Sequence, residues 1–442
     1  MGQRRRGAER RSYGRHALPV LLTVAVALAT SLAGTASSPP LLGRPGQSLP
    51  ATSRSVAAAT RGLWVLRSTL TSRARVDQLV RQAADNGFNT LFVQVRARGD
   101  AFFAGSVEPR GEGVTPGFDP LAHVLDAGHR AGLRVHVWVN VNFIASAVTL
   151  PSDPAHLVHT HPEWLMAPRD LAPSLAALSP RDRRYVARLA EWTRSRSDRV
   201  EGLYVSPIPV AAARYLEAIV ANLAERYPID GLHLDYVRYP GPQFDYSAGA
   251  LATFREAVAP ELAPADRVRL DARLAREPLV YADYLPARWA QYRRARLADL
   301  VARLRRAVKA RRPEAWLSAA VIPDAGEAYR DRLQDWPDWA RRGLIDAICP
   351  MAYTASLTRF TRQIEEVERA ASGQPVWAGI GAWRLRPAQI IQHIGAARSA
   401  GADGTVLFSY DSLNEHERTS GALGAIGRAT ALDPSAPVAS TR

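Results

Sequence analysis

The sequence predicts an α/β fold, a (β/α)8 TIM barrel with long loop insertions after strands three and four. Eight apolar runs of strand length follow one another between residues 61 and 413. Segments with helical periodicity separate these runs, and several of those segments end in a glycine just before the next strand. A doubly wound open sheet is the second choice, because no glycine-rich phosphate loop follows the first strand.

The predicted strands are short, mostly apolar and rich in β-branched and aromatic residues. In chain order they are "GLWVLR" (62–67), "NTLFVQVRA" (89–97), "LRVHVWVNVN" (133–142), "IDGLHLDYVRY" (229–239), "AWLSAAVIP" (315–323), "IDAICPMAY" (345–353), "PVWAGIGAW" (375–383) and "GTVLFSY" (404–410). Such runs are typical of parallel strands that are buried on both faces.

The connections between the strands carry the helices. Clear examples are "RARVDQLVRQAADNG" (73–87), "DPLAHVLDAGHRAG" (119–132) and "RYLEAIVANLAERY" (214–227). The glycines that we expect to end helices are Gly87, Gly132, Gly343 and Gly401. Residues 143–200 and 241–286 are longer than a simple crossover needs, so we interpret them as the insertions. Long loops at the carboxyl ends of barrel strands usually build a substrate cleft.

The chain ends predict four domain-level segments. Residues 1–36 have a basic start, an apolar stretch and small residues at their end, the plan of a signal peptide. Residues 37–60 are predicted to be a flexible linker, residues 61–430 the barrel, and residues 431–442 a disordered tail. We therefore expect an exported protein, periplasmic or extracellular, with no membrane contact beyond the export signal. An uncleaved N-terminal anchor is the alternative.

The composition excludes several classes of protein. The formal net charge of +15 comes partly from the first sixty residues, which hold eight arginines against one acid. No basic stripe with interleaved aromatic residues appears, so a nucleic-acid partner is not expected. Cys349 is the only cysteine, which excludes an intrachain disulfide, and its apolar neighbours predict a buried side chain. The sequence leaves the oligomeric state open.

Polar and aromatic residues follow the predicted strands, at the end where barrel enzymes hold their active sites. Besides the groups discussed next, these candidates for substrate binding are Asn140, Asp324, Tyr353, Trp383 and Tyr410. Carboxylates that act as acid, base or nucleophile, together with flat rings that stack on sugars, are what a sugar-processing cleft needs.

The fourth strand concentrates the ionisable groups. His233 and Asp235 are two residues apart and share a face, so Asp235 should lie at the rim and His233 one layer deeper. We predict that Asp235 is catalytic and that His233, Tyr236 and Arg238 contact substrate. The alternatives are a structural ion-pair network at the barrel mouth and, for His233, a packed histidine.

The second strand offers a partner group. Asp100 is the tentative second catalytic carboxylate and Arg96 a substrate-binding residue, although an Arg96–Asp100 pair that only fixes the loop is the alternative. The histidines of "HLVHTH" (156–161) lie in an insertion without a paired carboxylate motif. We therefore expect no metal there, and no cofactor is implied.

With these residues assembled, the chain resembles the glycosyl-hydrolase-like family 10 group of exported bacterial TIM-barrel proteins. The matching motifs are "RGLWV" (61–65), "GFNTLFVQVRARGDAFF" (87–103), "FDPLAHVLDAGHRAGLRVHVWVN" (118–140), "HPEWL" (161–165), "YPIDGLHLDYVRYP" (227–240) and "IDAICPMAY" (345–353). The resemblance implies a glycoside hydrolase that acts on a polysaccharide outside the cytoplasm, and peptidoglycan glycan strands are the leading expectation.

Two departures from the family pattern matter. Members often carry paired aspartates where this chain has Asp235 and Tyr236. The same strand is similar to that of family 18 chitinases, whose acid glutamate falls on Val237, and valine cannot donate a proton. The second acid must therefore come from elsewhere, with Asp100, Asp324 or Asp411 as candidates. If no second acid exists, a non-catalytic glycan-binding barrel is the alternative. A metal-dependent deacetylase is a weaker reading.

Overall fold

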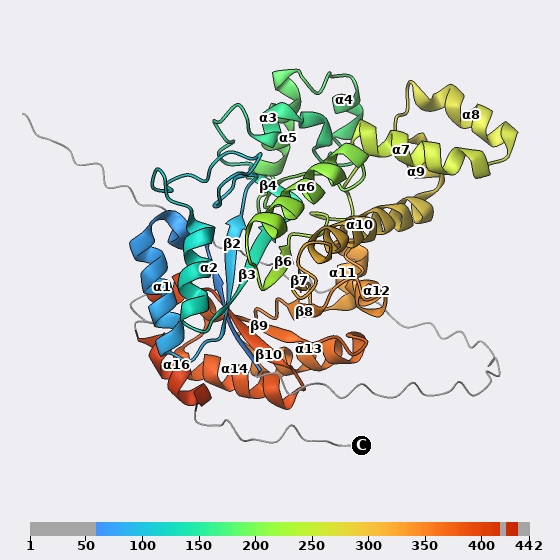
Figure 1. Ribbon diagram of the computed structural model, residues 1–442. Coiled ribbons are helices and arrows are strands. Elements are labelled where there is room, and N and C mark those ends of the chain that lie inside the picture. Colours follow the sequence, from blue (N-terminus) through green and yellow to red (C-terminus); the bar gives the residue numbers. More distant parts are fainter. Residues whose placement is uncertain (1–58, 416–420, 432–442) are drawn as a thin grey trace, which may run out of the picture. The chain divides into compact units, whose positions relative to one another are not determined.

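The computed structural model describes residues 59–415 and 421–431. Eight parallel strands form a nearly closed barrel, in the order β8-β7-β6-β3-β2-β1-β10-β9 (Figure 1). They are β1 (Thr60–Val65), β2 (Thr90–Arg96), β3 (Arg134–Asn140), β6 (Gly231–Asp235), β7 (Trp316–Val321), β8 (Ala347–Pro350), β9 (Trp377–Gly381) and β10 (Gly404–Phe408). Each lies within or overlaps one predicted strand, so the predicted (β/α)8 barrel is confirmed.

Two isolated parallel bridges connect the strands at the ends of this order. Ile348 pairs with Val376, and Met351 pairs with Gly379, so β8 and β9 meet. A side chain on Gly379 would strike the carbonyl oxygen of Pro350 at 2.6 Å. The backbones therefore approach closely at this seam because residue 379 is a glycine.

Helices connect the strands and surround them in Figure 1. They are α1 (Arg73–Asp85), α2 (Pro120–Arg130), α3 (Leu157–Thr160), α4 (Ala172–Ala176), α5 (Arg183–Arg194), α6 (Val210–Arg226), α7 (Ala248–Val258), α8 (Pro264–Leu274), α9 (Val280–Tyr284), α10 (Pro286–Lys309), α11 (Ala325–Asp331), α12 (Trp336–Arg341), α13 (Leu357–Ala370), α14 (Pro387–Ser399), α15 (Tyr410–Glu415) and α16 (Ala422–Ala431). Short 3-10 helices are η1 (Arg67–Thr71), η2 (Pro162–Trp164), η3 (Ala259–Glu261) and η4 (Ala382–Arg384).

The predicted helix-ending glycines all adopt the left-handed conformation, with φ between +61° and +101°. At the end of α1, Gly87 has φ +72°, and the N–H of Phe88 donates to the carbonyl of Ala83 at 3.0 Å. This pattern satisfies carbonyl groups that the last helical turn leaves free.

Aromatic side chains fill the barrel interior. Trp64, Phe92, Trp138 and Trp377 belong to one buried cluster, together with the small side chain of Cys349. Because alternate residues of a strand point inward, these side chains pack in layers and leave a solid core. Cys349 is buried as expected, and burial raises the pKa of its thiol well above the ordinary value.

Two larger clusters pack outside the strands. One lies between the barrel strands and most of the helices. The other gathers side chains of α7, α8, α9 and α10 around Phe254 and Trp289, whose ring centroids are 4.9 Å apart. The segment after β6 that contains α7–α9 therefore has an apolar core of its own.

The long connections after β3 and β6 hold much of the remaining structure. The first contains a two-stranded antiparallel sheet of β4 (Phe143–Ser146) and β5 (Gly202–Tyr204), as well as α3 to α6. The second contains α7 to α10. That these connections are insertions added to a simpler barrel stays a prediction.

The predicted signal peptide and the linker up to residue 58 lie outside the described residues, and so does the tail from residue 432. The predicted boundaries of these segments stay predictions. Among the described helices, none combines the length and the apolar character that crossing a membrane requires.

Candidate functional site

Asp235 is the last residue of β6, at the mouth of the barrel. It pairs in register with Asn140 of β3, and its carbonyl accepts a hydrogen bond from Val141 at 2.7 Å. The side chain is buried, and its Oδ1 accepts from the backbone N–H of Tyr236 at 2.6 Å. Burial raises the pKa of Asp235, against the opposing effects of Arg238 and of that N–H. A carboxyl group of this kind keeps its proton at higher pH than an exposed aspartate does.

Arg238 lies between two carboxylates. Its Nη2 is 3.3 Å from Glu201 Oε1, and its Nη1 is 3.8 Å from Asp235 Oδ1. The second distance is too long for a hydrogen bond, so the link to Asp235 is electrostatic. The guanidinium also lies 4.3 Å from the ring centroid of Tyr236. Burial disfavours the charged form, but Tyr204 and the two carboxylates raise the pKa of Arg238, which stays charged.

Glu201 is a second carboxylate of this site that the sequence reasoning missed. It lies just before β5, and its Oε2 accepts from the Tyr204 hydroxyl at 2.8 Å. Burial alone would raise the pKa of Glu201, but Arg238, Arg332 and the Tyr204 hydroxyl lower it. Glu201 follows a helix and no barrel strand, so a search of barrel strand ends passes over it.

Tyr236 continues β6 in an unusual backbone conformation. Its φ of +49° is rare for a residue with a side chain. The ring stacks on Phe143 with centroids 4.8 Å apart and planes at 26°, and Arg238 covers it as well. The predicted site residue Tyr236 therefore follows Asp235 directly and contacts the Arg238 guanidinium through its ring.

Two predicted aromatic residues form a wall near Asp235. Tyr353 follows β8 and Trp383 lies in η4 after β9, and their ring centroids are 5.0 Å apart at an angle of 80°. Phe408 of β10 contacts both rings. Burial, and next the Asp235 carboxylate, raise the pKa of Tyr353. Tyr353 and Trp383 are only partly exposed, and rings of this kind can stack on a sugar.

His233 lies one layer below Asp235, inside the barrel. Its Nε2 accepts from the Trp64 indole N–H at 3.1 Å, and its Nδ1 is 2.9 Å from the Ser318 hydroxyl. Burial lowers the pKa of His233 to about 3, so the ring is neutral. Both ring nitrogens are engaged inside the core, an arrangement that favours the packed alternative over the predicted contact with substrate.

Arg96 and Asn140 are bound within the protein. Arg96 is fully buried, and its Nε and Nη2 donate to the two oxygens of Glu108 at 2.8 and 2.6 Å. Its Nη1 donates to the carbonyls of Asn140 and Val141. The Asn140 amide donates to the Ala97 carbonyl at 2.8 Å. These contacts hold the ends of β2 and β3 together, and the substrate-binding roles of Arg96 and Asn140 stay predictions.

Asp100 lies in the loop after β2. Its Oδ1 accepts from the backbone N–H groups of Arg98 at 2.7 Å and Ala97 at 3.3 Å. The alternative Arg96–Asp100 ion pair is not formed, because Arg96 pairs with Glu108. Asp100 therefore shapes the loop. Nothing in its described contacts connects it with Asp235, and its catalytic role stays a prediction.

No described contact joins Asp324 or Tyr410 to the group around Asp235. Asp324 is exposed and caps α11, where its Oδ1 accepts from the Glu327 N–H at 2.8 Å. The hydroxyl of Tyr410 donates to Gln82 of α1 at 2.7 Å. The next residue, Asp411, accepts from Thr69 at 2.6 Å and from the Leu66 N–H at 2.7 Å. The contacts of these three residues therefore hold helices and loops in place.

The histidines of the 156–161 tract have separate partners. The Nε2 atoms of His156 and His159 lie 2.7 Å from backbone carbonyl oxygens, and His161 lies 2.9 Å from a Glu163 oxygen. Within residues 59–415 and 421–431, no group of three or more His, Cys, Asp or Glu side chains has an arrangement that could hold a metal ion.

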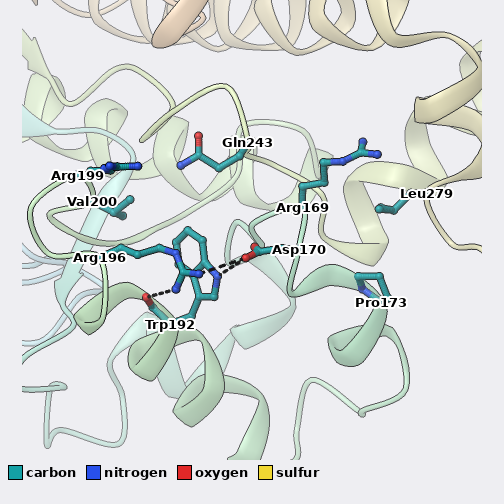
Figure 2. A pocket seen from close by; sticks show the side chains of 9 residues that line it. All are labelled: Arg169, Asp170, Pro173, Trp192, Arg196, Arg199, Val200, Gln243 and Leu279. Carbon is teal, nitrogen blue, oxygen red and sulfur yellow. Dashed lines mark hydrogen bonds and ion pairs between the residues drawn. The ribbon is translucent and has the colours of Figure 1, made fainter. Parts of the chain in front are cut away.

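A separate surface pocket of about 520 Å³ lies beside α5. Figure 2 shows the Arg196 guanidinium over the Trp192 ring, 4.3 Å from its centroid, with Asp170 bound to both side chains. Arg169, which also lines the pocket, pairs with Asp283 at 2.6 Å. None of the predicted site residues lines this pocket, and each of its three arginines already has an acidic partner.

The chain matches a family model described as "Glycosyl hydrolase-like 10" over residues 59–381. It is 25% identical to glycosyl hydrolase DigH of Escherichia coli K12 over 375 residues, which cover 75% of this chain and 74% of that protein. It is 23% identical to glycosyl hydrolase YngK of Bacillus subtilis 168, over 60% of this chain and 46% of that protein.

Solved structures with the same fold include glycoside hydrolases. The glycoside hydrolase domain of PgaB (BpsB) from Bordetella bronchiseptica superposes with a TM-score of 0.59 at 15% identity, over 83% of this chain and 99% of that domain. The catalytic domain of β-amylase from Paenibacillus polymyxa superposes with a TM-score of 0.55 at 12% identity, over 84% and 100%. At these identities the likeness establishes the fold alone.

Proposed function

Because this chain belongs to the glycosyl hydrolase-like 10 family, we propose that it is an exported glycoside hydrolase. Its substrate is a polysaccharide of the cell envelope or the extracellular space, and peptidoglycan glycan strands are the leading candidate. Export is supported by the basic and then apolar N-terminus. The polysaccharide is supported by the family and by the aromatic wall beside Asp235.

The observation that carries the proposal is the buried Asp235 at the mouth of the barrel. Glycosidic bond cleavage needs an acid that protonates the leaving oxygen. Burial raises the pKa of Asp235, so this carboxyl group is the one that keeps a proton to donate. The rate should fall as pH rises through the pKa of Asp235, because the ionised form cannot donate.

Glu201 supplies the contrasting carboxylate. Arg238 and Arg332 lower its pKa, whereas burial raises that of Asp235. Two carboxyl groups whose environments separate their pKa values are the usual arrangement for distinct acid and base roles. In our proposal the ionised Glu201 holds Arg238 in place. Arg238 in turn keeps a positive charge 3.8 Å from Asp235, and this charge stabilises the carboxylate left after proton transfer.

A non-catalytic glycan-binding barrel is the second candidate. The observation that favours it is the Arg238 charge beside Asp235, since a positive charge opposes protonation. Val237, fully buried after Asp235, also offers no acid. On this alternative the aromatic residues Tyr353 and Trp383 bind sugar without turnover.

A panel of glycans separates the two candidates. Wild-type protein would be incubated with purified peptidoglycan glycan strands, with and without stem peptides, and with chitin oligomers. New reducing ends measure cleavage, and co-sedimentation measures binding. Cleavage of any member supports a hydrolase and narrows its substrate. Binding without new reducing ends supports the glycan-binding barrel and contradicts the hydrolase.

A further inference from the structure

Two arginines whose side chains take no part in the contacts above lie near the ends of adjacent barrel strands. Arg67 comes two residues after β1, and Arg98 comes two residues after β2. The last residue of β1, Val65, pairs in register with Val93 of β2, so the two strand ends are neighbours. Both arginines therefore lie on the mouth side of the barrel, the side on which Asp235 ends β6.

The backbone around Arg98 is firmly held. Asp100 Oδ1 accepts from the Arg98 N–H at 2.7 Å, and His156 Nε2 lies 2.7 Å from the Arg98 carbonyl oxygen. Gly99 has φ +67°, and a side chain there would meet His156 at 2.6 Å. The loop thus fixes where the Arg98 side chain starts, as a binding residue requires.

The two side chains are only partly exposed and are not neutralised within the protein. Neither guanidinium has a hydrogen bond, an ion pair or an aromatic face as partner in the part of the chain that the structure describes. The fully buried Arg96, by contrast, is paired with Glu108, and Arg238 is paired with Glu201.

The positive charges of Arg67 and Arg98 destabilise each other in the protein without a ligand. Burial and then the neighbouring charge of Arg67 lower the pKa of Arg98, while Asp100 and Tyr236 partly oppose the change. Two unpaired positive charges in a partly buried place repel each other. An anion that binds between them reduces this repulsion. Tyr236, one of the two residues that oppose the change, directly follows Asp235 in the chain.

We propose that Arg67 and Arg98 together bind a carboxylate group of the glycan, in a subsite next to Asp235. The inference rests on the proposed function, and it names the substrate class as a glycan with carboxylate-bearing sugars. Arginine suits this role because its planar guanidinium donates two parallel hydrogen bonds to a carboxylate. The carboxylate can come from an ether-linked acid substituent, as on muramic acid, or from a uronic acid.

Binding without turnover tests the inference. In an Asp235→Asn background, calorimetry would compare a short muramic-acid glycan with a free carboxylate, the same glycan with that group amidated, a uronic-acid oligomer and a chitin oligomer. We expect at least one free-carboxylate probe to bind about tenfold or more tightly than the uncharged probes, an advantage typical of hydrogen bonds between charged groups. The tighter of the muramic-acid and uronic-acid probes identifies the source of the carboxylate.

Matched variants assign the preference to the two arginines. Arg98→Gln and Arg67→Gln should each remove most of it, while Arg98→Lys keeps the charge and should retain part. Arg199→Gln is the control, because that side chain is 81% exposed and lies in the connection between α5 and β5. Thermal unfolding of each variant checks that it is folded.

The inference is overturned if charged and uncharged probes bind within about twofold of each other, if no probe binds, or if folded Arg67 and Arg98 variants keep the full preference. These outcomes are independent of cleavage. A protein that prefers carboxylates but never releases reducing ends contradicts the hydrolase and leaves the arginine subsite standing. A protein that cleaves glycans without preferring charged ones supports the hydrolase and contradicts the arginine subsite.

Discussion

Asp235 and Glu201 approach the same guanidinium from two sides, at 3.8 and 3.3 Å from Arg238. Burial dominates the first carboxyl group and raises its pKa, whereas the arginines near the second lower its pKa. The difference arises from Asp235 lying at a strand end against the barrel core, while Glu201 has two arginines and a tyrosine hydroxyl around it. Local environment thus gives two chemically similar side chains opposite protonation behaviour.

The stability of the protein should depend on pH through Asp235. The folded pKa is raised, so above pH about 3.9 the unfolded chain loses this proton before the folded chain does. As pH rises, wild type should therefore lose stability relative to Asp235→Asn, until pH passes the folded pKa and the difference levels. Urea unfolding of both proteins across a pH series measures this difference in stability. The raised pKa would be contradicted if the difference in unfolding free energy between the two proteins stays constant with pH or grows in favour of wild type. Asp126→Asn, on the exposed face of α2, is the control.

At the scale of elements, Arg96 of β2 donates to the carbonyls of Asn140 and Val141 at the end of β3, and it also pairs with Glu108. Both side chains are fully buried, and the pair uses two hydrogen bonds. Arg96→Met should lower the free energy of unfolding by about 3–5 kcal/mol, because Glu108 is left buried without a compensating positive charge. Combining it with Glu108→Leu should recover much of the loss. If Arg96→Met instead keeps wild-type stability in guanidinium unfolding but loses glycan binding, the result contradicts this structural role and supports the predicted substrate role of Arg96.

The end of α1 depends on one glycine. Gly87 has φ +72° and no atom within 4 Å of the place where a side chain would begin. Gly87→Ala should therefore cost about 1 kcal/mol through backbone strain alone. Gly395 lies inside α14, also with open space around it, and Gly395→Ala should stabilise by up to about 1 kcal/mol. Thermal unfolding midpoints that move the same way for both variants would contradict this reasoning.

The sequence predicts elements better than it predicts partners. Strand and helix positions follow from apolar periodicity and glycine caps, which are local, so all eight barrel strands could be placed. The partners of Arg96 and Arg238 are Glu108 and Glu201, which lie in connections without periodicity. The hydrogen bond from the Tyr410 hydroxyl to Gln82 of α1 could not be predicted from the position of Tyr410 after a strand. The direction of a side chain after a strand depends on the turn that follows.

At the scale of the whole molecule, the barrel brings distant segments of the chain to one mouth. The ends of β6, β8 and β9 supply Asp235, Tyr353 and Trp383, and the connection before β5 supplies Glu201. The interior beneath is filled by aromatic side chains and a neutral His233. This filled core supports the site rigidly and confines the chemistry to the rim, as in other barrel enzymes.

The measurement that tests the central claim most directly is the release of new reducing ends from peptidoglycan glycan strands, with wild type and Asp235→Asn compared side by side. Asp126→Asn is the matched control for loss of a carboxyl group. We expect wild type and the control to cleave the strands, and Asp235→Asn to be slower by about 10²-fold or more, since it lacks the proton donor. Equal cleavage by wild type and Asp235→Asn would contradict the account.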